Sequence, residues 1–334
     1  MREINKYQNI LSYKINLNEI IQYENGSVKI NGTNFETIKN KIYIIYIDQH
    51  YYIDDREGNY FILNKELKVI ESGVNKAFFS LFNYVGFQLI EDDIIYTGVI
   101  ENNKYLKKKI NVWGPTFCFK NSILVFLKNL EIIDFLNFKN EVTISFPLST
   151  LGTCLDGVIE KPYQVAGFSG IYENTLVCTM NSGAILLLDI EKGEVKGFFK
   201  DAKVNSGVYQ KEENSPIFLG LSHWTFIEIN AETGEMLRQI DIEDELKRVT
   251  NIADESPCWF GVAIALYHEG LFYFYGHRQF LGIYDPANEK IIDFHWFKFE
   301  KKQTQLKGGI ENLQVKGNEI YCLDTANTLH ILNR

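Results

Sequence analysis

Residues 185–195 read ILLLDIEKGEV, and residues 226–236 read FIEINAETGEM. The two stretches match position for position, with Asp189 and Asn230 at the end of an apolar run and Gly193 and Gly234 in the turn that follows. An apolar strand, a polar turn with glycine and a second strand form a β-hairpin, in which the glycine accepts the positive φ that such turns require. The match therefore predicts a hairpin that the chain repeats.

Weaker copies of this hairpin occur along most of the chain. The residue that follows the apolar strand marks each copy, and these markers are Asn64, Glu101, Asp134, Asp189, Asn230, Asp285 and Asn333. Periods of roughly 20–50 residues are typical of propellers and solenoids. Short runs rich in Ile, Val, Phe and Tyr dominate, and only residues 242–249 have helical character. We predict seven units, with six or eight as alternatives.

With these repeats the sequence resembles the β-propeller repeat superfamily, in particular its WD40-like and quinoprotein-like members. The resemblance covers nearly the whole chain and implies an all-β fold, a seven-bladed β-propeller of four-stranded antiparallel blades in a single domain over residues 1–334. The motifs that carry the resemblance are a turn and a pair of strands, which many propeller families share. The chain has no Trp-Asp dipeptide and only one Gly-Gly pair, Gly308 and Gly309, so no narrower family is indicated.

The end of the last repeat predicts how the blades close. The last blade, residues 304–334, stops after its third strand, while residues 9–17 (NILSYKINL) form a strand pattern that belongs to no unit. Pairing the two would remove open sheet edges, which otherwise invite aggregation. We therefore expect an N-terminal strand at about residues 9–17 to complete the last blade.

Composition and motifs exclude several classes of function. A net charge of -9 disfavours nucleic-acid binding, because such proteins need a cationic face. No apolar run is long enough to span a membrane and no secretory signal opens the chain, so we expect a cytoplasmic protein. The five cysteines include no CxxC pair and the six histidines have no ligand spacing, so we expect neither metal nor cofactor.

The candidate site comes from the topology of a propeller blade. If each blade runs A, B, C, D from the axis outward, all turns between strands B and C lie at the same end of the sheets. Those turns carry imidazole, indole, guanidinium and carboxylate groups, which suit anion or peptide binding. The candidate binding residues are His223, Trp224, His277, Arg278, Asp324, Asp92, Asp93 and Arg56.

The leading functional hypothesis is a non-enzymatic protein-binding propeller. Two insertions, residues 148–168 and 242–260, are where we expect partner contacts, because long loops on rigid scaffolds often carry function. By resemblance to stand-alone bacterial propellers, the chain could neutralise a toxin as an immunity protein or act as an adaptor, and would be a monomer when free. GxSxG, GxxxxGK[ST] and HExxH motifs are absent. The alternative is a hydrolase or lyase that uses the central funnel on a glycan or small metabolite.

Overall fold

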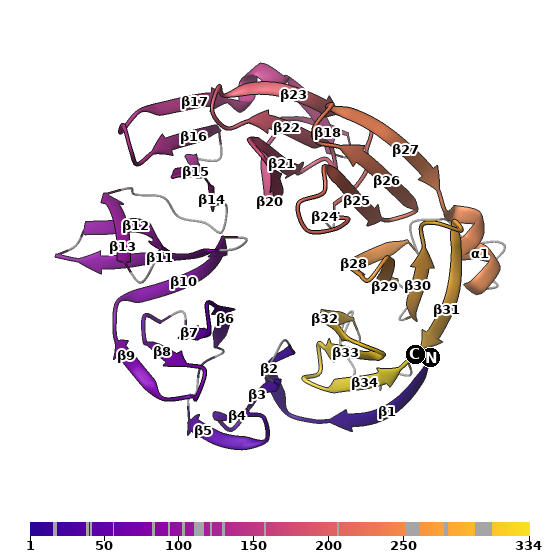
Figure 1. The fold of residues 1–334 in the computed structure, drawn as a ribbon. Helices are drawn as coiled ribbons and strands as arrows, with labels where there is room; N and C mark the ends of the chain where they lie inside the picture. The colour runs from indigo at the N-terminus through magenta and orange to yellow at the C-terminus, as the bar shows by residue number, and fades with distance from the viewer. Residues whose placement is uncertain are drawn as a thin grey trace. The chain divides into compact units, whose positions relative to one another are not determined.

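The computed structural model consists almost entirely of antiparallel β-sheets (Figure 1). It describes residues 1–334 apart from 16–18, 38–39, 41, 56, 82–83, 93, 102–103, 110–116, 121, 129–130, 157, 206, 251–260, 277–279 and 298–308. Within that part of the chain, eight sheets have four strands each, which is the blade of a β-propeller. The chain divides into two compact units, Asn9–Pro147 and Met1–Gln8 with Leu148–Arg334. We call these the N-unit and the C-unit.

The N-unit contains four blades. Their strands are β2 (Ile10–Ile15), β3 (Glu19–Tyr23), β4 (Ser27–Ile30) and β5 (Thr33–Thr37); β6 (Tyr43–Ile47), β7 (His50–Asp54), β8 (Tyr60–Asn64) and β9 (Val69–Gly73); β10 (Lys76–Leu81), β11 (Tyr84–Glu91), β12 (Ile94–Glu101) and β13 (Lys104–Lys109); and β14 (Phe117–Lys120), β15 (Ile123–Lys128), β16 (Ile132–Asn137) and β17 (Thr143–Pro147).

The C-unit contains the other four blades. Their strands are β20 (Val165–Tyr172), β21 (Thr175–Met180), β22 (Ile185–Asp189) and β23 (Glu194–Phe199); β24 (Val208–Gln210), β25 (Ile217–Ser222), β26 (Thr225–Asn230) and β27 (Glu235–Asp241); β28 (Val262–His268), β29 (Leu271–Gly276), β30 (Phe280–Asp285) and β31 (Lys290–Trp296); and β32 (Ile310–Lys316), β33 (Glu319–Asp324), β34 (Leu329–Asn333) and β1 (Arg2–Tyr7). It also holds the 3-10 helix η1 (Leu148–Leu151), the hairpin strands β18 (Thr153–Asp156) and β19 (Ile159–Pro162), and helix α1 (Glu243–Thr250).

The propeller fold and the alternative of eight blades are confirmed, whereas the preferred number of seven is wrong. The missing blade is β2–β5. Its strands are short, and its third and fourth strands join through Asn31 and Gly32, both with positive φ, instead of through the longer turn used as the marker. An Asn-Gly turn between two strands is a strong hairpin signal, but it differs from the longer turn that the other blades repeat.

An N-terminal strand does complete the last blade, but it is β1 and not residues 9–17. Strand β1 pairs with β34 from Arg2 opposite Asn333 to Tyr7 opposite Leu329, whereas β2 pairs with β3 as the first strand of the missing blade. Strand β1 is exposed along most of its length and therefore needs no apolar face. Its sequence, REINKY, accordingly lacks the apolar alternation by which a strand is recognised. The expectation of a single domain over residues 1–334 remains a prediction.

The repeated turn follows the predicted pattern. The side chain of Asp189 accepts hydrogen bonds from the backbone N–H groups of Glu191 and Lys192, and Asn230 does the same for Glu232 and Thr233. Gly193 and Gly234 both adopt positive φ. Asp134 was the wrong marker, because β16 continues to Asn137 and the side chain of Asn137 binds the turn.

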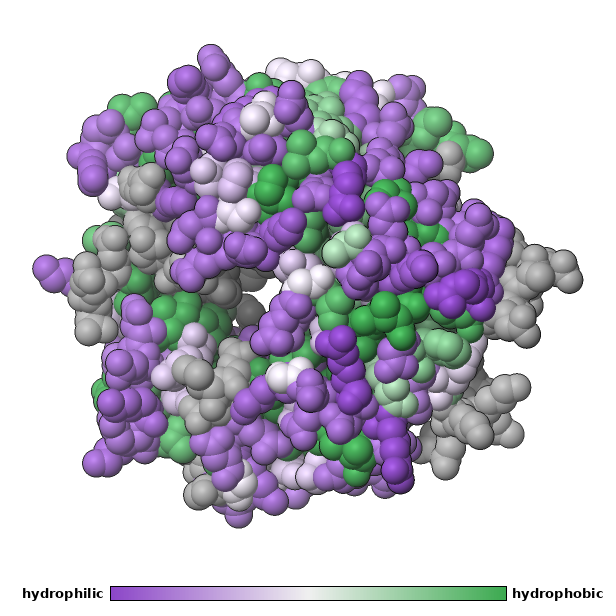
Figure 2. All heavy atoms as spheres, turned by 45° about the vertical axis from the view of Figure 1, so that its right-hand side comes forward, coloured by the Kyte–Doolittle hydropathy of each residue, from purple (hydrophilic) through white to green (hydrophobic). Residues whose placement is uncertain are grey.

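Apolar residues from successive blades interlock to form the core of each unit. In the C-unit, Tyr273 and Leu281 of one blade share a cluster with Ile320 and Leu332 of the next. On the side of the molecule shown in Figure 2, hydrophobic surface occurs in small areas between hydrophilic ones. That distribution is ordinary for a protein surface.

The outermost strands carry a recurrent β-bulge. In six of the eight blades the fourth strand has one extra residue at the corresponding place, and these residues are Phe35, Ile70, Lys196, Leu237, Ile292 and Ile4. A bulge twists an edge strand and interrupts the row of N–H and C=O groups that another chain could pair with. Strand β13 has no register shift, but Lys104 and Lys109 are exposed on it, and lysine on an edge strand opposes pairing with another chain by its charge.

Candidate functional site

The structure places each predicted binding residue that it describes in a turn between the second and third strands of a blade. His223 and Trp224 connect β25 to β26, Asp324 ends β33, and Asp92 lies between β11 and β12. The other four, Arg56, Asp93, His277 and Arg278, lie outside the described residues. Asp92 belongs to the N-unit, so the site below is built from His223, Trp224 and their neighbours in the C-unit.

His223 is held in an unusual backbone conformation. Its φ is 51°, in the left-handed region, at the first position of a two-residue hairpin turn where glycine is normally preferred. Its N–H donates to the carbonyl of Val262 at 2.8 Å, and its own carbonyl accepts from the N–H of Val262 at 2.6 Å. A Cβ at Gly261 would come within 3.1 Å of the His223 Cα, so glycine there permits the approach. The next blade therefore fixes this turn.

Trp224 is partly anchored and partly exposed. Its ring packs against the core cluster that contains Phe226 and Leu246, and it lies 5.7 Å from the imidazole ring of His223. Its backbone carbonyl accepts the N–H of Ile242 at 2.7 Å, immediately before α1. The ring is thus oriented by the protein while one part stays accessible, which is the condition of an aromatic anchor at an interface.

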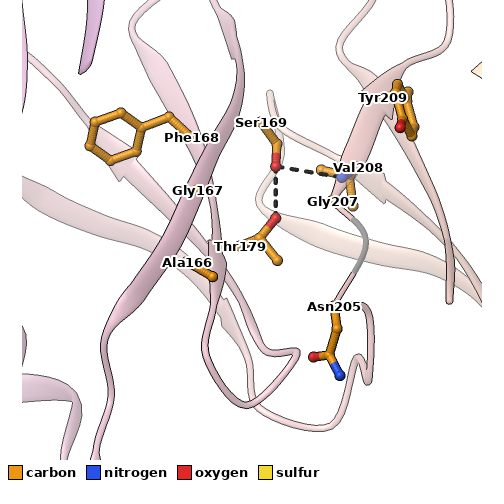
Figure 3. A pocket seen from close by; sticks show the side chains of 9 residues that line it. All are labelled: Ala166, Gly167, Phe168, Ser169, Thr179, Asn205, Gly207, Val208 and Tyr209. Atoms are coloured by element: carbon orange, nitrogen blue, oxygen red, sulfur yellow. Dashed lines mark hydrogen bonds between the residues drawn. The ribbon is translucent and has the colours of Figure 1, made fainter. Parts of the chain in front are cut away.

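A cavity of about 350 Å³ lies between the first strands of two neighbouring blades, β20 and β24 (Figure 3). The residues that line it are Ala166, Gly167, Phe168, Ser169, Thr179, Asn205, Gly207, Val208 and Tyr209. The hydroxyls of Ser169 and Thr179 are 2.7 Å apart, and the Val208 N–H donates to the Ser169 hydroxyl at 3.5 Å. Figure 3 shows the side chains of Ser169 and Thr179 turned toward one another and the Phe168 ring turned away.

Asn205 joins this cavity to the His223 turn. Its backbone N–H donates to the Ser222 hydroxyl at 3.2 Å, and its side-chain Nδ2 lies 2.9 Å from Nε2 of His223. The cavity, Asn205 and the His223 turn therefore form one continuous polar site. We call it the inter-blade site.

The chemistry of the inter-blade site suits binding better than reaction. Among the described residues that line the cavity, none carries a carboxylate, an amine or an imidazole, and the imidazole of His223 belongs to the adjoining turn, where it contacts Asn205. The Ser169 hydroxyl pairs with another hydroxyl and not with a base, so it has no activating partner there. No group of three or more potential metal ligands occurs in the part of the chain that the structure describes.

Sequence reasoning missed Ser169, Thr179 and Asn205. Strand β20 has register shifts on both sides of Gly167, and the second makes Ser169 the extra residue of a bulge. A bulge changes the direction of a side chain relative to simple alternation. The two glycines near Ser169, Gly167 and Gly170, are the available signal, because glycine inside a strand often marks a bulge.

Asp324 has a structural role that the candidate assignment did not foresee. It is 4% exposed, and its carboxylate accepts the N–H groups of Ala326 and Thr328 at 2.9 and 2.8 Å. It also lies 3.0 Å from Nε2 of His330, whose Nδ1 is 2.6 Å from Glu3 on β1. Burial alone would raise the pKa of Asp324, but the hydrogen bonds from His330 and the Thr328 backbone lower it overall. Asp324 thereby connects its turn to the strand that completes the blade.

The first predicted insertion contains the two most exposed large apolar side chains of the described chain, Val158 and Leu155. Leu155, Val158 and Ile159 are 71%, 97% and 58% exposed around the turn of the β18–β19 hairpin. At its base Cys154 contacts Asn181, and Tyr163 packs edge-on against Phe198. We call the three exposed residues the hairpin tip. In the second insertion the structure describes α1, while residues 251–260 lie outside the described residues.

The N-unit has a smaller cavity, of about 190 Å³, and Asp92 is not among the residues that line it. Gly58, Lys76 and Ile90 are among the residues that line it. The Lys76 amine is held by Glu71 at 2.6 Å and lies 4.3 Å from the centre of the Tyr60 ring. Burial and the hydrogen bond to Glu71 raise the pKa of Tyr60 to about 12. This cluster ties two blades together, and its two charged groups, Lys76 and Glu71, are paired with each other.

Comparison with known proteins identifies the fold. No protein-family model matches the sequence, and no curated protein sequence matches it. Similar solved structures include the computationally designed protein Ika8, at 12% identity over 99% of this chain and 98% of that one, with a TM-score of 0.63. BamB from Moraxella catarrhalis is similar at 13% identity over 99% of both chains, with a TM-score of 0.59.

The C-terminal WD40 domain of Sif2 is similar at 10% identity over 100% of this chain and 98% of that one, with a TM-score of 0.64. These likenesses confirm the β-propeller resemblance. In the described part of the chain, no helix is long and apolar enough to cross a membrane.

Proposed function

We propose that this β-propeller binds another protein through the C-unit and performs no chemistry of its own. The observation that carries the proposal is the hairpin tip, where Leu155, Val158 and Ile159 are all exposed within one short stretch of an insertion, Leu155 and Ile159 on opposite faces of the hairpin. Scattered single apolar residues are normal on a surface, but three exposed apolar side chains around one hairpin turn present area that a partner enclosing the turn would remove from water. Full burial of such side chains is worth about 1.5–3 kcal/mol each.

The inter-blade site supports the same proposal. His223 keeps a left-handed backbone conformation where glycine would be less strained, and strain of this kind often marks a functional position. Trp224 beside it is a partly exposed ring with a fixed orientation. Among the described lining residues there is no carboxylate, amine or imidazole, and the Ser169 hydroxyl pairs with that of Thr179 and not with a base, which gives the hydrolase or lyase alternative no support there.

The proposal also covers the kind of partner and the compartment in which the protein acts. An acidic chain with a net charge of -9 suits a basic partner, as an immunity protein that blocks a toxin or as an adaptor. We propose a bacterial protein that acts in the cytoplasm, is a monomer when free, and binds neither nucleic acid nor membrane. Reducing conditions there suit Cys178 and Cys322, which are buried and unpaired.

Site-specific photo-crosslinking in cells that naturally express the chain tests this proposal. A photoreactive residue at Val158 should give one discrete covalent adduct with another protein, and excess unlabelled chain should compete it away. The matched control is Val142, which is 51% exposed in the N-unit and should give no such adduct. Recovery of the Val158-labelled chain only as a free monomer would contradict protein binding.

A further inference from the structure

The walls of the inter-blade cavity are polar but uncharged. Ser169 and Thr179 supply hydroxyls and Asn205 supplies a carboxamide, and no described lining residue carries a charge. Thr179 is only 3% exposed, so its hydroxyl is fixed within the wall. A charged group that entered would lose its hydration without gaining a counter-charge, which is costly. The cavity therefore selects for neutral groups that form hydrogen bonds.

The position of the cavity favours a peptide backbone over other neutral ligands. Strands β20 and β24 are the first strands of their sheets, so in the part of the chain that the structure describes each has one edge that pairs with no other strand. Such edges present N–H and C=O groups that an extended peptide can match. Gly167 leaves the backbone of β20 open, because a Cβ built there would meet no atom within 4 Å.

We propose that the inter-blade cavity binds an extended, uncharged peptide segment whose carboxamide or hydroxyl side chain faces Ser169 and Thr179. This inference rests on the proposed function, since the peptide would belong to the protein partner. Through its contact with His223, Asn205 places the peptide beside the His223–Trp224 turn. The cavity of about 350 Å³ lies at the lower end of the range for small-ligand pockets, so it accommodates a short segment and not a folded element.

Blocked tripeptides provide the probe. Acetyl-Ala-X-Ala-amide with X as Asn, Gln or Ser should shift the backbone amide resonances of Gly167, Gly207 and Val208. The same peptide with X as Asp or Lys should bind at least about tenfold more weakly, because the cavity offers no counter-charge. An equal response to the charged peptides, or no response to any peptide, would overturn the proposal. A response to glucose without one to the peptides would also overturn it.

Two glycine variants distinguish loss of peptide binding in the cavity from a general loss of folding. Gly167→Leu adds a side chain at the cavity wall, and since its Cβ would have no neighbour within 4 Å the backbone need not move; the variant should abolish the peptide response. Gly309→Leu is the matched control, because a Cβ there also has no neighbour closer than 4.0 Å and Gly309 lies outside the cavity. It should keep the response. A Gly167→Leu chain that still responds, with a melting temperature equal to the control, would refute binding in this cavity.

The crosslink at Val158 distinguishes failure of this inference from failure of the proposed function. If Gly167→Leu loses the peptide response but the wild-type chain gives no Val158 adduct, the protein-binding proposal fails. If the adduct forms equally with and without Gly167→Leu and no peptide binds, the partner binds the C-unit without using the cavity, and this inference alone fails.

Discussion

Replacing Asp324 by alanine tests whether the last turn of the chain holds the completing strand. The side chain is 4% exposed and accepts hydrogen bonds from Ala326 and Thr328, with His330 at 3.0 Å. A hydrogen bond to a charged group contributes about 1.5–3 kcal/mol, and losing one partner leaves the other buried and unsatisfied. Since such effects are not additive, we expect Asp324→Ala to lower the free energy of unfolding by about 3–5 kcal/mol.

Urea denaturation at neutral pH measures this loss, and amide hydrogen exchange locates it. Protection should fall first at Leu329 and Ile331 in β34 and across β1, because His330 connects Asp324 to Glu3. Asp201→Ala removes an exposed carboxylate in the same unit and should change stability by less than about 0.5 kcal/mol. A loss below about 1 kcal/mol for Asp324→Ala would refute the structural role. It would return Asp324 to the binding candidates.

Three further predictions concern His223, the bulge of β27 and the protonation of Asp324. His223→Gly should leave the chain as stable as the wild type or about 0.5–1 kcal/mol more stable by thermal unfolding, because glycine accepts the left-handed φ. The same variant should weaken partner binding. A clear loss of stability would contradict the argument that His223 is strained. Deletion of Leu237 should remove the bulge of β27 and straighten an edge strand. Light scattering should then show aggregation that the wild-type chain lacks. A deletion variant as soluble as the wild-type chain would count against protection of the edge by the bulge. The pKa of Asp324 is lowered on folding, so its contribution to stability is complete above about pH 4 and is lost as the pH falls through its folded-state pKa. The melting temperature of Asp324→Asn should therefore depend less steeply on pH below about pH 4 than that of the wild-type chain. Equal steepness would contradict this role of Asp324.

The sequence determines the repeated hairpin because its chemistry is local. Asp189 and Asn230 bind the turn within their own neighbourhood, and Gly193 and Gly234 supply the positive φ. The blade formed by β2–β5 was missed because its third and fourth strands join through the short Asn31–Gly32 turn. Strand β1 was missed because its partner, β34, is at the far end of the chain and its own side chains are mostly exposed.

The sequence predicted a residue of the candidate site correctly only where the order of the strands alone determines its position. Counting strands placed His223 and Trp224 correctly in a turn between the second and third strands. The role of Asp324 depends on Glu3 and His330, which lie over 300 residues apart in sequence, and no local pattern contains that contact. The contribution of Ser169 depends on a bulge in β20, which simple alternation does not predict. The exposed hairpin tip lay within a predicted contact segment, but its exposure follows from tertiary structure.

The hairpin tip provides the most direct test of the protein-binding proposal. Once the partner is identified by the Val158 crosslink, calorimetry should compare its affinity for the wild-type chain and for the chain with Leu155, Val158 and Ile159 all changed to serine. Because these side chains are exposed in the free chain, the melting temperature should not change. We predict a loss of affinity of more than about a hundredfold, given roughly 1.5–3 kcal/mol for each buried apolar side chain. An affinity within about threefold of wild type would contradict partner binding through the hairpin tip.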